Sequence, residues 1–300
     1  MKPRSRAEDE QAPMRVHTAV ILAAGHGTRF LPATKAIPKE MLPLIDRPIV
    51  QYVVEEAVAA GIDHIVMVTS AGKRAIEDHF DRAPVVEAAL AAKGDEARLD
   101  ELTRLVGLAH MSFVRQKEQL GVGHAVLQAR RVVGREPFLL AFPDDIIESE
   151  VPAARQLMDV YERHGSVVAV EQVPREDIPS YGIVSGEQIE ENVYKLDRLV
   201  EKPRIEDAPS DLGIVGRYVL SPDVFDILET TKPGAGGEIQ VTDALAELAR
   251  RGAMYACRFQ GQRFDTGRPL GLLKASIEIG LRRPDIGPEL RAFLRSLPLD

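Results

Sequence analysis

Residues 21–47 read ILAAGHGTRFLPATKAIPKEMLPLIDR, a hydrophobic segment that breaks into a glycine-rich turn. The segment belongs to a continuous apolar run over 16–24, which is typical of a parallel strand buried on both faces. Gly25 and Gly27 then allow backbone N–H groups to approach a ligand without interference from a Cβ atom. The stretch therefore predicts a central strand followed by a ligand-binding turn.

The rest of the chain alternates between strand and helix patterns. Apolar runs predict further strands over 64–70, 111–116, 137–142 and 166–173, and helical periodicity covers 48–60, 71–80, 85–106, 123–133 and 151–164. After residue 174, short-spaced strand patterns suggest a mixed or antiparallel extension, with helices over 221–230, 242–251 and from 269 onward. This order predicts an α/β fold, a Rossmann-like doubly wound mixed sheet with a β extension and C-terminal helices.

The chain of 300 residues has room for one large domain or two small ones. Residues 1–15 are polar and aperiodic, so we expect a disordered tail. Because no clean linker interrupts the remainder, we expect a single domain over 16–300. Within this domain, a first half would cover about 16–150 and a second half about 151–300.

Composition restricts the class of protein. A net charge of -8 argues against a nucleic-acid partner, and no apolar run is long enough to predict a membrane span. The one cysteine, Cys257, lies in a strand-like segment and is expected to be structural. Without a disulfide framework or a secretory segment, a cytoplasmic location is expected.

The cations after the glycine turn suit an anionic ligand. Arg29 can span two phosphate oxygens, and Lys39 offers a compact charge, whereas Lys35 is equally compatible with a surface position. A nucleoside triphosphate carries about four negative charges, which explains several cations at one turn. The dinucleotide pattern G-x-G-x-x-G fails because Phe30 replaces its third glycine, which argues against a dinucleotide-dependent oxidoreductase.

Two aspartates at distant strand ends indicate a metal site. Asp144 follows the strand 137–142 and Asp265 follows another predicted strand, so the pair could hold one Mg²⁺. Asp145 is expected to be a turn residue that points elsewhere. The seven histidines show no metal-ligand spacing, and Ser70–Lys73 matches S-x-x-K without the partner motifs of a serine nucleophile.

Several motifs together resemble the bacterial UTP–glucose-1-phosphate uridylyltransferases of the sugar nucleotidyltransferase family. The matching segments include residues 23–57, VRQKEQLGVGHAV (114–126), PDD (143–145), VEKP (200–203) and PGAGGEIQVTDA (233–244). Together with YGIV, IVGRYVLS and FDTG, they cover nearly everything from residue 16 to about 280. FDTG departs from a DCG-like form in some relatives but keeps its aspartate.

The resemblance implies a role for each matching residue. Nucleotide contacts are assigned to Ala24, Gly25, Glu40, Gln116 and Gly121, and contacts with the sugar and its phosphate to Gly182, Glu201, Lys202 and Ile214. Arg29 and Lys39 would hold the triphosphate as catalytic residues, and Asp144 and Asp265 would bind Mg²⁺. The implied substrates are UTP and glucose 1-phosphate, and the family commonly forms homodimers or homotetramers.

Three alternatives remain open at the level of sequence. A glucose-1-phosphate thymidylyltransferase, or an enzyme with relaxed choice of sugar 1-phosphate, would catalyse the same chemistry, because uracil and thymine differ by one methyl group. A non-catalytic sugar-nucleotide sensor would bind the same ligands without turnover. Retention of Arg29, Lys39, Asp144 and Asp265 argues against the sensor.

Overall fold

A computed structural model describes residues 15–234 and 237–298 of the chain. The predicted tail therefore lies, apart from Arg15, outside the described residues. Within the described ranges, no helix combines the length and the apolar composition needed to cross a bilayer.

A parallel sheet forms the nucleotide-side half, as the apolar runs predict. β1 (Thr18–Leu22) lies between β4 (His64–Thr69) and β6 (Phe138–Ala141), and β5 (His110–Arg115) pairs with the far edge of β4. All three pairings are parallel. After β1 the chain adds β4 and then β5 on one side, and it then crosses to add β6 on the other side of β1. The strand order therefore reverses between β1 and β6.

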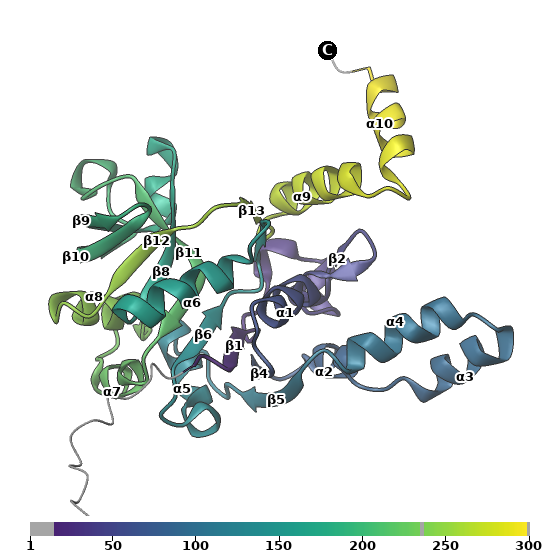
Figure 1. Ribbon diagram of the computed structural model, residues 1–300, viewed down its shortest axis with the longest axis horizontal. Helices are drawn as coiled ribbons and strands as arrows, with labels where there is room; N and C mark the ends of the chain where they lie inside the picture. Colours follow the sequence, from purple (N-terminus) through teal and green to yellow (C-terminus); the bar gives the residue numbers. More distant parts are fainter. Residues whose placement is uncertain (1–14, 235–236, 299–300) are drawn as a thin grey trace, which may run out of the picture.

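The sheet continues into the predicted mixed extension. Beyond β6 it runs through β11 (Leu212–Leu220), β8 (Val167–Gln172), β12 (Tyr255–Arg258), β10 (Val193–Glu201) and β9 (Gly182–Glu190). β11 is antiparallel to both β6 and β8, whereas β12 is parallel to β8. Nine strands therefore join both halves of the chain into one sheet, which confirms the predicted fold class (Figure 1).

Helices cover both faces of the sheet (Figure 1). Successive residues of β1 face opposite sides, and Ile21 packs in the core formed with α1 (Ile49–Ala59), α2 (Arg74–Phe80) and α6 (Ala153–His164). Val20 packs in the opposite core, which contains α5 (Val122–Val133), α7 (Asp223–Thr230) and α8 (Val241–Arg250). Burial on both faces explains why the strand sequence is a continuous apolar run.

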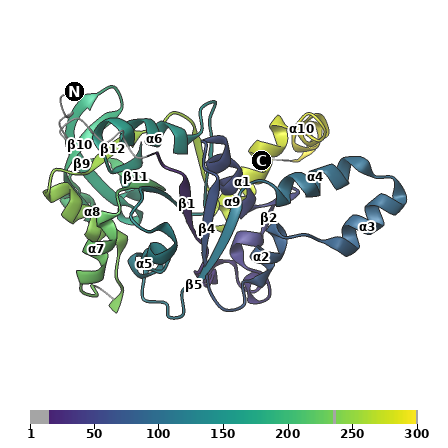
Figure 2. The same ribbon diagram turned by 60° about the horizontal axis from the view of Figure 1, so that its bottom comes forward.

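The predicted helical region 85–106 is a pair of helices that projects from the body (Figure 2). α3 (Pro84–Lys93) and α4 (Glu96–Val106) are separated at Gly94, which adopts a left-handed conformation with φ 68°. At the carboxyl terminus, α9 (Pro269–Arg282) and α10 (Gly287–Ser296) fulfil the predicted helical ending.

Short elements complete the ligand-facing edge. β7 (Asp145–Glu148), which the sequence pattern did not predict, pairs antiparallel with β13 (Gln262–Asp265) and places Asp265 opposite Asp145. Three short 3₁₀ helices follow β1, over Thr28–Phe30, Ala33–Lys35 and Lys39–Met41, and lead into β2 (Pro43–Leu44) and β3 (Arg47–Pro48). Two more lie at Arg175–Ser180 and Ile205–Asp207.

Candidate functional site

The glycine turn leaves the carboxyl end of β1 at the point where the strand order reverses. The carbonyl of Ala24 accepts hydrogen bonds from Ser70 Oγ at 2.9 Å and from Gln119 Nε2 at 3.1 Å. A Cβ atom built on Gly25 would face open space, whereas Gly27 has φ 67° and a Cβ atom built on it would lie 3.0 Å from Lys39 Cβ. Both the left-handed conformation and the close approach of Lys39 favour glycine at this position.

Lys39 and Asp144 form an ion pair beside this turn. Lys39 Nζ donates to Asp144 Oδ2 at 2.6 Å, and both side chains are more than half buried. Burial lowers the pKa of Lys39, but the charge of Asp144, the hydrogen bond to it and the charge of Glu40 together outweigh burial and raise that pKa above its usual value. Burial raises the pKa of Asp144, but the charge and hydrogen bond of Lys39, with a backbone hydrogen bond and the charge of Arg29, together bring that pKa below its usual value. Both groups are therefore charged at neutral pH.

Asp144 and Asp265 flank one small space, as the sequence predicted for strand ends. A Cβ atom built on Gly267 would lie 3.0 Å from both Asp144 Oδ2 and Asp265 Oδ1. Thr266 N and Oγ1 each donate to the carbonyl of Asp144 at 2.8 Å, and Gly267 N donates to Asp265 Oδ1 at 2.9 Å. Contacts from Thr266 and Gly267 thus hold the two aspartates close together, with Asp144 Oδ2 and Asp265 Oδ1 each 3.0 Å from one point.

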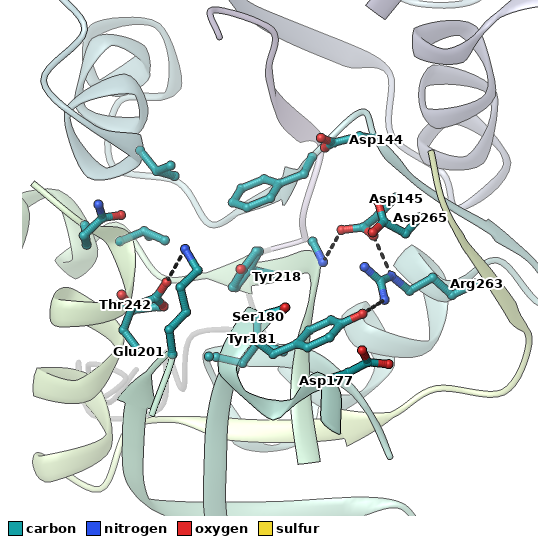
Figure 3. A pocket seen from close by; sticks show the side chains of 18 of the residues that line it. Asp144, Asp145, Asp177, Ser180, Tyr181, Glu201, Tyr218, Thr242, Arg263 and Asp265 are labelled. Atoms are coloured by element: carbon teal, nitrogen blue, oxygen red, sulfur yellow. Dashed lines mark hydrogen bonds and ion pairs between the residues drawn. The ribbon is translucent and has the colours of Figure 1, made fainter. Parts of the chain in front are cut away.

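The carboxylate of Asp145 is bound by other partners than this pair, but Asp145 begins strand β7, so the prediction of a turn residue was wrong: its backbone pairs with Asp265 of β13. Its Oδ2 accepts from Gly216 N at 3.0 Å and its Oδ1 accepts from Arg263 Nε at 2.5 Å. Arg263 also donates to Tyr181 Oη at 3.0 Å and lies over the Tyr181 ring (Figure 3). Arg263 therefore links the loop after β6 to the segment that precedes β9.

A cavity of about 420 Å³ opens between the two halves of the sheet. Asp144, Asp145 and Asp265 lie at one end of it and Glu201 and Thr242 at the other (Figure 3). The structure brings seven of the predicted site residues to this cavity: Arg29, Asp144, Asp265, Gly182, Glu201, Lys202 and Ile214. Lys39 joins them through its ion pair with Asp144.

The Glu201–Lys202 segment adopts an unusual backbone conformation at the cavity. Lys202 has φ 44°, in the left-handed region that residues with a Cβ rarely occupy, and its N–H donates to the carbonyl of Tyr181 at 3.0 Å. Its Nζ lies 3.2 Å from Glu201 Oε1. Such backbone strain concentrates at ligand sites, where surrounding contacts hold it.

Gln116 and Gly121 lie together, outside the cavity lining, in the loop between β5 and α5. Gln116 is buried and its Nε2 donates to the carbonyl of Gly121 at 3.1 Å. Gly121 has φ 99°, and a Cβ there would approach the carbonyl oxygen of Ile239 to 2.6 Å. Only glycine fits this contact, which holds the loop against the segment that precedes α8.

Glu40 is turned into the protein. Its side chain is fully buried, and Lys73 Nζ donates to Glu40 Oε1 and Oε2 at 2.9 and 2.7 Å. Burial is the main cause that raises the pKa of Glu40 and lowers that of Lys73, each partly offset by the partner's charge. A direct contact between Glu40 and a nucleotide stays a prediction.

Sequence reasoning missed several residues of the site. Arg217 is fully buried and donates to the carbonyls of Phe142 and Asp145, at 2.9 and 2.7 Å, as well as to Glu56. Tyr181 and Thr242 also line the cavity. Both belong to motifs that carry the family resemblance, YGIV and QVTDA, so the motifs could have identified them as site residues. Arg217 stands within IVGRYVLS, where its charge in an apolar strand gave a similar signal.

A doubly wound sheet with a glycine turn, paired carboxylates and a polar cavity at the reversal point defines a nucleotide-binding α/β protein. A family model described as nucleotidyl transferase matches residues 18–280, and the chain belongs to this family. It is 48% identical over 286 residues to a UTP–glucose-1-phosphate uridylyltransferase of Staphylococcus epidermidis, covering 95% of this chain and 99% of that one. A Bacillus subtilis protein of the same name is 50% identical over 284 residues, with 94% and 96% coverage.

Solved structures agree with this placement. UTP-bound UGPase from Acinetobacter baumannii superposes with a TM-score of 0.87 at 40% identity, over 94% of this chain and 99% of that one. UDP-glucose pyrophosphorylase in complex with UDP-glucose gives a TM-score of 0.82 at 42% identity, over 89% and 100%. The resemblance drawn from the motifs is confirmed.

Proposed function

We propose that this chain transfers the uridylyl group of UTP to α-D-glucose 1-phosphate, giving UDP-glucose and pyrophosphate. The observation that carries the proposal is that Arg29, the two aspartates Asp144 and Asp265, and the Glu201–Lys202 segment line the same cavity. It offers cations and a metal-ligand pair for phosphates, together with a carboxylate that can accept hydrogen bonds from sugar hydroxyls. The names of the relatives and the ligands of the similar structures support the same reaction.

The roles within this proposal follow the position of each residue. Near the carboxyl end of β1, backbone and amide groups would contact the nucleotide, with Glu40 nearby. These groups belong to Ala24, Gly25, Gln116 and Gly121. At the opposite end, Gly182, Glu201 and Ile214 would hold glucose, and Lys202 would reach its phosphate.

The paired aspartates fit a magnesium ion. Asp144 and Asp265 each place a carboxylate oxygen 3.0 Å from one point, and hard divalent ions prefer such oxygen ligands. In the described part of the chain no cluster of three or more protein ligands forms, which suits an ion that keeps waters and binds substrate phosphates. When bound, Mg²⁺ would neutralise phosphate charge.

The proposed chemistry is a direct displacement. A phosphate oxygen of glucose 1-phosphate forms a bond to the α-phosphorus of UTP, and the bond from that phosphorus to the bridging oxygen of pyrophosphate breaks. The attacking oxygen is already anionic, so no general base is required. Arg29 and Lys39 would orient the triphosphate and neutralise the charge that moves onto the leaving group.

An assay of pyrophosphate release tests the proposal. We expect UTP with glucose 1-phosphate to be the best pair when four nucleoside triphosphates are crossed with glucose, galactose and mannose 1-phosphates. Preference for dTTP would indicate a thymidylyltransferase, and similar rates for several sugars would indicate relaxed choice. Binding of UDP-glucose without any pyrophosphate release in Mg²⁺ would indicate the sensor.

Assembly and location are proposed from the family alone. We expect a homodimer or homotetramer in the cytoplasm, and sedimentation velocity of the purified chain would test the assembly. A monomer at micromolar concentration would contradict it.

A further inference from the structure

The loop between β4 and α2 carries two buried polar residues that the proposed reaction does not use. These are Ser70 and Lys73, the ends of the S-x-x-K pattern, and both side chains are almost completely buried. The pattern does not serve as a nucleophile and base, because Lys73 is engaged by Glu40 and the Ser70 hydroxyl donates to Ala24. Each residue instead contacts a different part of the segment that follows β1.

Ser70 fixes one peptide of the glycine turn. Its hydroxyl donates to the carbonyl of Ala24 at 2.9 Å, and Gln119 donates to the same oxygen. In a trans peptide the C=O and the following N–H point in opposite directions. The N–H of Gly25 is therefore directed away from Ser70, and a Cβ atom built on Gly25 would meet nothing within 4 Å.

Lys73 fixes the short helix that carries Lys39. Its ammonium group binds both carboxylate oxygens of Glu40, at 2.9 and 2.7 Å, with neither side chain open to water. Glu40 follows Lys39 in the 3₁₀ helix Lys39–Met41, and successive side chains of a 3₁₀ helix are about 120° apart. Fixing Glu40 therefore fixes the rotation of this helix and the direction in which Lys39 leaves it.

We propose that Ser70 and Lys73 are positioning residues of the triphosphate site, Ser70 for the Ala24–Gly25 peptide and Lys73, through Glu40, for Lys39. The inference rests on the proposed function. The two contacts reach the site from one loop, so the β4–α2 loop acts as a support beneath the turn rather than as a contact with substrate.

The first test removes the buried pair without leaving a lone charge. The double variant Glu40→Gln/Lys73→Met is expected to fold, because both buried charges are removed together. We expect its kcat for pyrophosphate release to fall about 10- to 100-fold, with KM for glucose 1-phosphate little changed, because a misplaced Lys39 affects the triphosphate end. UTP affinity by calorimetry should fall as well.

The effect of Lys39→Ala, compared between the double variant and the wild type, distinguishes a loss of Lys39 positioning from a general loss of stability. Lys39→Ala should cost much less kcat in the double variant than in the wild type, because Lys39 is already misplaced there. The control is Leu157→Ala, a fully buried residue of α6, which should lower stability while keeping kcat and the full effect of Lys39→Ala. Full additivity in the double variant, or near-normal kcat, would overturn the inference.

Ser70→Ala tests the other contact. Because Gln119 still donates to Ala24, we expect UTP affinity to fall only about fivefold, the scale of one hydrogen bond. If the wild-type protein binds UTP but never releases pyrophosphate, that result contradicts the proposed function alone. The UTP affinities of the variants, measured by calorimetry, then still test the positioning role of Ser70 and Lys73. Unchanged UTP affinity in both Ser70→Ala and the double variant would overturn the inference even if the wild type turns over.

Discussion

The two proposed catalytic cations have different surroundings. Arg29 is exposed at the cavity, whereas Lys39 is held at 2.6 Å by Asp144 in a more buried place. Because Lys39 is already paired with Asp144, an arriving triphosphate would compete with Asp144 for the Lys39 ammonium group, and a metal ion would compete with Lys39 for the Asp144 carboxylate. The ion pair therefore prepares both groups, keeping each charged and oriented before the ligand binds.

Removing either member of this pair tests its role. We expect Lys39→Ala or Asp144→Ala to reduce kcat by at least about 100-fold, the scale observed when one electrostatic contact to a transition state is lost. Pyrophosphate release measures the effect. Lys93→Ala removes an exposed charge from α3 and serves as the control with normal turnover. A folded Lys39→Ala variant with near-normal kcat would contradict the assignment.

Cys257 supports the expectation of a structural residue. It is buried in β12, and burial raises the pKa of its thiol to about 11 from 9.0. At pH 8 about one thiol in a thousand is then ionised, and only the thiolate reacts. We expect iodoacetamide to leave the native protein unlabelled over hours at pH 8 and to label it rapidly in denaturant. Fast labelling of the native chain would mean that β12 opens readily.

At the scale of elements, the loop after β6 is held from beneath by a buried arginine. Arg217 of β11 donates to the carbonyls of Phe142, Gly216 and Asp145, and pairs with Glu56 of α1 at 2.7 Å. Glu56 Oε1 also accepts from Ala154 N at the start of α6, where a helix favours negative charge. One charge pair thus connects a strand, two helices and the loop that presents Asp144.

Breaking this network should be costly. Arg217→Met leaves Glu56 buried without its partner, so we expect the free energy of unfolding to fall by about 3–5 kcal/mol. In the double variant Arg217→Met/Glu56→Gln the free energy of unfolding should fall by less, because no buried charge is left without a partner. Urea unfolding followed by circular dichroism measures both. Equal losses in the single and double variants would show that the carbonyl contacts, rather than the charge pair, dominate.

At the scale of the molecule, sequence periodicity was enough for the main sheet and its helices. Strands buried on both faces, such as 16–24, give long apolar runs, whereas β7 has four residues and begins with Asp145, so no run marked it. The contacts within the site were harder to predict, because they join side chains that are far apart in the sequence. Lys73 and Glu40, or Arg217 and Glu56, become partners only when the sheet brings their elements together.

The shared sheet also bears on the predicted single domain over 16–300. Since the cavity takes residues from loops after β1 and β6 and from β9 and β10, ligand should stabilise both halves together. At 100 times its dissociation constant, UDP-glucose with Mg²⁺ should add about 2.7 kcal/mol and raise Tm by about 4 °C in one transition. Differential scanning calorimetry measures this rise in Tm. In the Asp265→Asn variant, which has a weaker pair of metal ligands, the same ligands should raise Tm by less. Two transitions, only one of which moves with ligand, would instead show that the halves unfold independently.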